Sequence, residues 1–342
     1  MIARVANAPR GVLGVVLGLV AALGFGAGGA IIKPLFEAGW SPGAAVLARL
    51  ILATILLTIP ALAMARFDLR PLLRSWKLVL AYGALAVAGV QLAFYASLER
   101  IPVSTALLIE YLAPVALLLA AWARTRRTPH RIVLIGAVIA LVGLVLVIGP
   151  TGVGPDGLDP FGVILAGIAM VGVAFYYVVG ARLPQDVPPV TVIWAGFIVG
   201  ATLLALAGAI GVLPMEMTTD DVAFFGTMAP WWAPLLTVAF VATALAYIAG
   251  IASIAFLGTR LASFLGLFEV VFAGIVGWIL LGEAIAPIGL VGAGLILVGI
   301  VLVRLEPSAA DAQTLPEPMP VTGSIEVIDR PGGSGDPVSR SE

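Results

Sequence analysis

Three ionisable residues, Arg49, Glu110 and Glu269, stand inside long apolar runs of the sequence. A charge inside such a run is costly unless it has a partner or faces a polar cavity, if the run spans a membrane. At about 1.5 Å per residue, Arg49 and Glu110 each lie roughly 10 Å from the nearer end of their runs. Gln91 lies at a similar depth, and Glu269 is close to the middle of its run. Arg49, Glu110 and Gln91 could therefore meet, because an arginine beside a carboxylate is a favoured buried arrangement.

The two carboxyl groups are candidates for exchanging a proton, because burial and neighbouring charges decide whether a carboxyl is neutral or ionised. For Glu110 the alternative is a static ion pair with Arg49 that fixes helix packing. Glu269 could relay a proton or bind an amine. Its alternative is a hydrogen bond to unpaired backbone in an imperfect helix.

Polar side chains at helical spacing accompany these three residues. Gln91 and Tyr95 are four residues apart, as are Thr243 and Tyr247, so each pair shares a helix face. Together they predict a polar cavity suited to a zwitterion or a sugar-like solute. Each alone could equally serve as a hydrogen bond between helices. The other candidates for this lining are Tyr111 and Tyr176.

Small residues crowd one half of the first apolar run, where four glycines lie within six positions. They permit either tight packing or a hinge that closes an outer gate. The four are Gly24, Gly26, Gly28 and Gly29.

The elements that must position these residues are membrane helices. The chain is 61% hydrophobic and only 11% charged, far from the composition of a soluble domain. Its apolar runs reach the roughly 20 residues of a transmembrane helix and do not alternate as barrel strands do. We therefore expect an all-α integral membrane protein with ten transmembrane helices. They are predicted near residues 11–32, 43–64, 78–97, 103–123, 131–149, 161–181, 190–212, 233–256, 260–281 and 286–303.

Composition also excludes several kinds of site. There is no cysteine and a single histidine, His130, so we expect no disulfide, metal centre or cofactor. No paired nucleophile and base lies within the apolar runs, so an intramembrane enzyme is not expected. A channel is disfavoured as well, and no nucleic-acid partner is expected.

Basic residues favour one side of the ten-helix arrangement. Of the 18 Lys and Arg residues, only Lys33 and Arg100 lie on the side opposite the termini, and Arg49 lies within a span. Short basic loops stay in the cytoplasm, so we expect both termini there. The Ala-, Gly- and Arg-rich composition is typical of a bacterial protein, which predicts a multi-pass protein of the bacterial inner (plasma) membrane.

An internal repeat relates the two halves of the chain. The segments 136–147 and 292–303 are offset by 156 residues and are identical at eight of twelve positions. Five spans per copy is an odd number, so the copies should be inverted in the membrane, an arrangement used for alternating access. The predicted domains are a cytoplasmic N-terminus (1–10), two repeats (11–149 and 161–303) joined by a loop (150–160), and a disordered cytoplasmic tail (304–342).

Two stretches carry a family resemblance. Residues 91–114, QLAFYASLERIPVSTALLIEYLAP, resemble the third-to-fourth helix signature of the EamA family in the drug/metabolite transporter superfamily. Residues 268–283, FEVVFAGIVGWILLGE, resemble its ninth-helix signature. The first stretch is most similar to the threonine/homoserine and amino-acid exporter branch. The chain has Glu269-Val270 where the family usually has Glu-Pro, whereas Pro114 is kept at the aligned place, so the second half should have a missing or softened helix break.

The resemblance implies a ten-helix secondary transporter, usually an exporter driven by the proton gradient. Its central cavity would be lined mainly by helices one, three, four, six, eight and nine. We therefore expect proton-coupled export of a small polar metabolite such as an amino acid. The alternatives are an importer or exchanger of another metabolite, and a non-transporting accessory subunit. The sequence does not set the oligomeric state.

Overall fold

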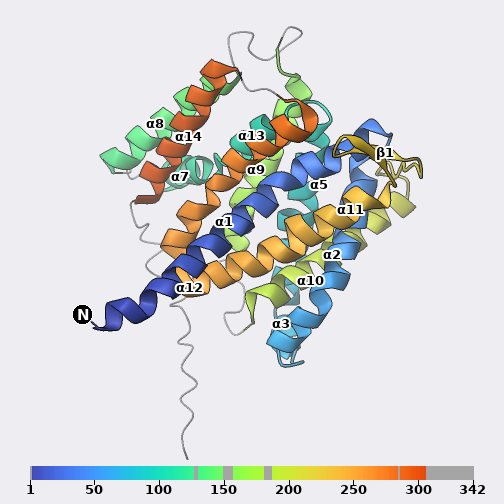
Figure 1. Ribbon diagram of the computed structural model, residues 1–342, viewed down its shortest axis with the longest axis horizontal. Coiled ribbons are helices and arrows are strands. Elements are labelled where there is room, and N and C mark those ends of the chain that lie inside the picture. The colour runs from blue at the N-terminus through green and yellow to red at the C-terminus, as the bar shows by residue number, and fades with distance from the viewer. Residues whose placement is uncertain (1, 127–129, 149–156, 181–186, 284–285, 306–342) are drawn as a thin grey trace, which may run out of the picture.

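The computed structural model describes residues 2–126, 130–148, 157–180, 187–283 and 286–305, and these are mostly helical (Figure 1). The expected all-α membrane architecture is confirmed in this coarse form. Within the described residues, eight helical stretches are long and apolar enough to cross a membrane. They are Gly11–Glu37, Pro42–Met64, Trp76–Leu98, Val103–Thr125, Arg131–Ile148, Pro189–Ala209, Trp232–Gly258 and Phe264–Leu281. Two shorter apolar helical stretches, Pro160–Phe175 and Pro287–Val303, coincide with the other two predicted spans. The predicted tail from residue 306 onward lies outside the described residues.

The first half of the chain forms α1 to α8, with one wider π-helical segment, η1, in the third predicted span. The elements are α1 (Ile2–Glu37), α2 (Pro42–Met64), α3 (Arg70–Arg74), α4 (Trp76–Ala81), η1 (Tyr82–Gly89), α5 (Val90–Leu98), α6 (Val103–Glu110), α7 (Ala113–Thr125) and α8 (Arg131–Ile148).

The second half follows a similar order and adds a short hairpin. The elements are α9 (Pro160–Gly180), α10 (Pro189–Ala209), β1 (Val222–Phe224), β2 (Thr227–Ala229), α11 (Trp232–Ala239), η2 (Phe240–Leu245), α12 (Ala246–Gly266), α13 (Phe268–Leu281) and α14 (Pro287–Leu305). Gly258 has a positive φ of 78° inside α12, a conformation that glycine adopts freely, and it separates the eighth and ninth predicted spans.

Both halves interrupt their helices at matching places. The fourth span breaks at Tyr111 and Leu112, just before Pro114, whose missing N–H cannot bond the backbone carbonyl of Glu110. The ninth span breaks at Leu267 alone, which aligns with Tyr111 at the 156-residue offset. The second break is therefore present without a proline and is the softer of the two. The π-helical segments η1 and η2 also fall at overlapping positions of the repeat.

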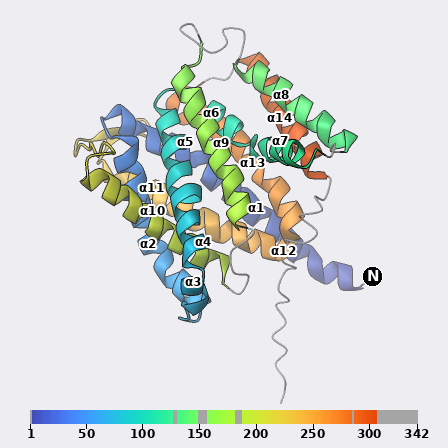
Figure 2. The ribbon, with the colours of Figure 1, turned by 180° about the vertical axis from the view of Figure 1, so that it is seen from behind.

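The repeated sequence motif turns out to be a helix contact. The helices α8 and α14 lie side by side at one edge of the molecule in both views (Figures 1 and 2). A Cβ added to Gly292 would lie 2.6 Å from the carbonyl oxygen of Gly143, and one added to Gly299 would lie 2.5 Å from that of Gly136. Glycine at these positions thus lets the two backbones touch.

The rest of the bundle surrounds α1, which packs against α12 and α13, while α2 packs against α10 and α5 against α9. The segment before α11 folds back over the α1–α2 turn. There Ser41 Oγ donates to the carbonyl of Pro214 at 2.8 Å, and Trp40 Nε1 donates to that of Thr218 at 2.9 Å. In Figure 1 the N-terminal end of α1 and the basic α3 lie low, while the β1–β2 hairpin lies at the upper right.

At the start of α9, Asp159 accepts a hydrogen bond from the Gly162 N–H at 2.9 Å and pairs with Arg100 at 3.4 Å. The Gly162 N–H, with smaller contributions from the Phe161 N–H and Arg100, holds the pKa of the Asp159 carboxyl below its usual value. Nearby, partial burial raises the pKa of Glu99, and Arg100 opposes that rise. These exposed charges mark the end of the bundle where α5, α6 and α9 meet.

Candidate functional site

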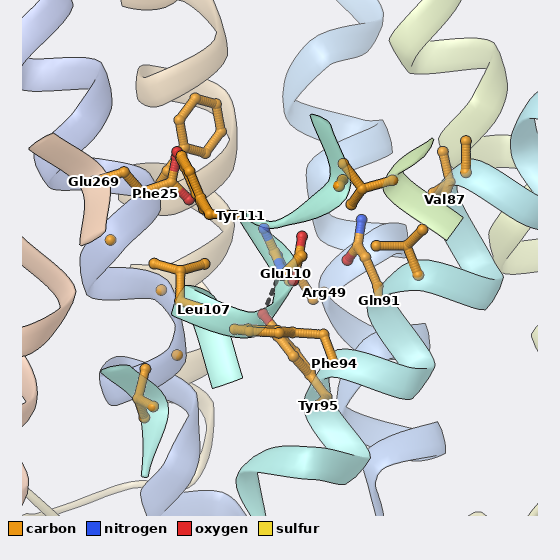
Figure 3. Close-up of a pocket in the computed structure, with 18 of the residues that line it drawn as sticks. Phe25, Arg49, Val87, Gln91, Phe94, Tyr95, Leu107, Glu110, Tyr111 and Glu269 are labelled. Carbon is orange, nitrogen blue, oxygen red and sulfur yellow. Dashed lines mark hydrogen bonds between the residues drawn. The ribbon is translucent and has the colours of Figure 1, made fainter. Parts of the chain in front are cut away.

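A cavity of about 420 Å³ lies between the two halves of the chain and receives most of the predicted site residues (Figure 3). Its walls come from α1, α2, η1, α5, α6, α7, α9, α12 and α13. The predicted residues that line it are Arg49, Gln91, Tyr95, Glu110, Tyr111, Tyr247, Glu269, Gly26, Gly28, Gly29 and Pro114. Thr243 and Gly24 are not part of this lining, and the side chain of Tyr176 lies outside the described residues.

Arg49 is held by neutral acceptors. Its Nη1 donates to the Tyr95 hydroxyl, and its Nε donates to Thr243 Oγ1 at 3.1 Å. Nη2 reaches the Ala242 carbonyl at 3.5 Å. Both η2 partners, Ala242 and Thr243, sit in a π-helical turn, a feature that is frequent at functional sites. Within the described residues Arg49 forms no ion pair with Glu110, so the favoured pairing expected from the sequence is not made here.

Glu110 is the last residue of α6, and its side chain faces the cavity. It accepts no hydrogen bond from any residue that the structure describes. Close to it on the cavity wall, Gln91 has a buried side-chain oxygen, Oε1, that also lacks a partner among the described residues. Two unpaired acceptors on one wall favour a ligand that donates hydrogen bonds, because a buried acceptor without a donor costs free energy.

Glu269 lies in the first turn of α13 and is bound from the other half of the chain. The Tyr111 hydroxyl is 2.7 Å from Glu269 Oε2 and 3.0 Å from the carbonyl oxygen of Gly266. Tyr111 stands at the α6–α7 break, and Gly266 ends α12 at the other break. The two interrupted helices therefore meet through this tyrosine.

An aromatic wall closes the cavity beside α12. Phe25 and Tyr247 make an edge-to-face contact with ring centroids 4.9 Å apart, and Phe197 also contacts Tyr247, with ring centroids 5.8 Å apart. Phe25 and Phe94 line the cavity but were not predicted from the sequence. An apolar side chain in a membrane helix carries no sequence signal that separates a cavity wall from a lipid-facing surface.

The four glycines of α1 lie at close contacts. A Cβ on Gly26 would lie 2.4 Å from the Glu269 backbone oxygen, and one on Gly29 would lie 2.5 Å from Val103 Cγ1. Gly24 and Gly28 approach η2 in the same way. The helix runs without interruption from Ile2 to Glu37. This geometry favours the packing alternative, and the hinge stays a prediction.

An ion pair joins residues that are distant in the chain at one end of the cavity. Lys33 Nζ donates to Glu283 Oε1, and Glu283 Oε2 accepts from the Val103 backbone N–H at 2.9 Å. Val103 begins α6 after Pro102 and lines the cavity. The Lys33 and Glu283 side chains are only 19% and 14% exposed. We call Lys33, Glu283 and the Val103 N–H the latch, because they join α1, α6 and the end of α13. In the sequence, Glu283 indicates only a residue at the water boundary.

No cluster of three or more potential metal ligands occurs within the described residues. The charged groups among the described residues that line the cavity are one guanidinium and two carboxyls. They come from α2 in the first half, from α6 at its break, and from α13 in the second half.

The EamA-like transporter family matches residues 12–149 and 160–305, which together make up most of the chain. The chain belongs to the EamA-like transporter family. It is thus a multi-pass membrane protein of the drug/metabolite transporter superfamily, a family of transporters and not of enzymes. The resemblance seen in the sequence is confirmed at the level of the family.

The other comparisons add the fold alone. No curated protein matches this EamA-like chain. A solved crystal structure, described only as that of a protein, is similar to it with a TM-score of 0.51 and 19% sequence identity. The similarity covers 88% of this chain and 98% of the other.

Proposed function

We propose that this EamA-like protein is a proton-coupled secondary transporter that exports a small polar metabolite, such as an amino acid. The observation that carries the proposal is the cavity in which Arg49, Glu110 and Glu269 converge from both halves of the chain. Its volume of about 420 Å³ is within the range of roughly 300–1,000 Å³ typical of small-molecule sites. A zwitterion matches these charges, with its carboxylate at Arg49 and its ammonium at Glu110 and Gln91.

Transport would proceed by alternating access between two inverted five-helix repeats, with ten spans in all. The matched breaks in the fourth and ninth spans and the α8–α14 contact support this symmetry. We place both termini in the cytoplasm and the protein in the bacterial inner membrane, on the basis of the basic loops. The latch of Lys33, Glu283 and Val103 then closes the outer end of the cavity.

The test uses purified protein in liposomes with a pH-sensitive dye inside and an imposed proton gradient. Amino acids, polyamines, sugars and nucleosides are added one at a time, and the Glu110→Gln variant runs beside the wild type. We expect one solute class to collapse the gradient saturably and Glu110→Gln to lower that flux by at least tenfold. Arg100→Gln, which removes an exposed charge outside the cavity, should leave the flux unchanged.

Other outcomes would replace the proposal with one of its alternatives. Movement of radiolabelled solute without protons would identify a uniporter or exchanger. Accumulation in the opposite direction under the cellular gradient would identify an importer. A complete lack of transport across the panel would favour an accessory subunit.

A further inference from the structure

The hydroxyl of Tyr111 has too few hydrogens for its two contacts if Glu269 is ionised. A phenol has one hydrogen, and both a carboxylate and a backbone carbonyl can only accept. With Glu269 ionised, Tyr111 could donate to Glu269 Oε2 at 2.7 Å or to the Gly266 carbonyl at 3.0 Å, but not to both. One of the two oxygen pairs would then be in close contact without a hydrogen between them.

A protonated Glu269 satisfies both contacts. Its O–H donates to the Tyr111 oxygen, and the Tyr111 O–H donates to the Gly266 carbonyl. That carbonyl is available because the Val270 N–H donates to Leu267 at the break instead of to Gly266. The chain of two hydrogen bonds thus completes the backbone pairing at the end of α12.

The charges around Glu269 are compatible with its protonated, neutral form. Among the described residues that line the cavity, Arg49 of α2 is the only cation, and it is hydrogen-bonded to Tyr95, Thr243 and Ala242. Glu110 faces the same cavity from α6 and would repel a second negative charge. The N-terminus of α13 favours an anion at Glu269, but within the described residues the hydrogen bond at its carboxyl is shared with Tyr111 and not with a backbone N–H group.

We propose that the two carboxyls have different roles. Glu269 is the binding site of the coupling proton, and Glu110, together with Gln91, binds the ammonium group of the substrate. This assignment rests on the proposed function for its role in transport. Tyr111 is the positioning residue. When Glu269 loses its proton, the Tyr111 hydrogen turns from Gly266 to the carboxylate. The Gly266 carbonyl then loses its partner, so both helix breaks respond to the proton.

The experiment that tests the assignment is infrared spectroscopy of the protein in lipid, which detects a protonated carboxyl directly and does not depend on transport. We expect the wild type to show an acid carbonyl band that Glu269→Gln removes and Glu110→Gln keeps. Tyr111→Phe should keep the band but shift its frequency, because the acceptor oxygen is gone. A purely structural role for Tyr111 would leave the frequency unchanged.

Glu269→Gln is suited to this test because its amide N–H can still donate to Tyr111, so the fold should be kept. In liposomes it should retain exchange of labelled for unlabelled substrate while losing accumulation driven by a pH gradient, whereas Glu110→Gln should lose both. An acid band that survives Glu269→Gln, or a wild type with no such band, overturns the assignment. If the band behaves as expected but no solute moves, the proton site stands and the transport proposal fails.

Discussion

Arg49 shows how the cavity keeps a cation available within a membrane helix. Within the described residues its three hydrogen bonds go to uncharged oxygens of two elements, the Tyr95 hydroxyl of α5 and the Thr243 hydroxyl and Ala242 carbonyl of η2. Because none of the described carboxylates forms an ion pair with it, it retains the ability to bind an anionic group of a substrate. The planar guanidinium can do so while still touching its present neighbours, since it has five N–H donors.

Replacing Arg49 with lysine should preserve the charge but lose this fork geometry. Hydrogen bonds to charged groups are worth about 2 kcal/mol each, which corresponds to roughly thirtyfold. We expect Arg49→Lys to lower kcat/KM for transport by about that factor in liposomes. Arg100→Lys is the matched control, because the Arg100–Asp159 pair is exposed and contributes little. Wild-type kcat/KM in Arg49→Lys would contradict the role given to the fork.

The sequence identified the ionisable residues of the site but not their partners. Depth along an apolar run follows from residue counting, so Arg49, Glu110 and Gln91 could be placed near one level, and Glu269 near the middle of its run, before any fold was known. Which side chains touch depends on helix neighbours and rotamers. Hydroxyls therefore took the place of the carboxylate beside Arg49, and Tyr111 proved to bridge to Glu269.

At the scale of elements, the interrupted helices line the cavity and the latch lies at one end of it. Pro114 indicates the first break in the sequence, whereas the second break at Leu267 has no proline. The two π-helical segments also lacked a sequence signal, because a wider turn is set by packing as much as by composition. The pairing of Lys33 with Glu283 could not be predicted from the sequence either, because the two residues lie 250 positions apart.

Opening of the latch can be followed with a single introduced cysteine, because the chain has none of its own. We expect Glu283→Gln to raise, several-fold, the rate at which an impermeant thiol reagent labels Ala86→Cys from the latch side. The reason is that Lys33 and the Val103 N–H both lose a charged acceptor in a mostly buried setting.

The control for this labelling is Asp159→Asn, which removes the charge from an exposed ion pair near the same end of the bundle. It should leave the rate as it is. Equal labelling of Ala86→Cys with and without Glu283 would show that the latch does not govern access to the cavity.

At the scale of the whole molecule, the internal repeat predicted two related halves but not how they join. The repeated glycine motif could have faced any neighbour. In the structure the two copies of the motif face each other, so that α8 and α14 form a pair of their own beside the cavity. The membrane-spanning class and the family thus followed from the sequence, and the contact between the repeats required the fold.

Two glycines of α14, two residues apart, test this contact. A Cβ at Gly292 would meet the Gly143 carbonyl oxygen at 2.6 Å, whereas a Cβ at Gly294 would meet nothing within 4 Å. We expect Gly292→Ala to destabilise the protein by about 1–3 kcal/mol through overpacking. Gly294→Ala should be neutral or slightly stabilising. Thermal unfolding in detergent measures both, and equal melting temperatures for the two variants would refute the close contact.

The same glycine contact has a consequence for biosynthesis. During translation α8 enters the membrane well before α14, and four predicted spans are made in between. Until α14 arrives, the face of α8 that carries Gly136 and Gly143 has no final neighbour. We therefore expect a membrane insertase or chaperone that recognises such a face to stay bound to α8 until α14 arrives, and polypeptides terminated before α14 should be preferred substrates of membrane quality-control proteases.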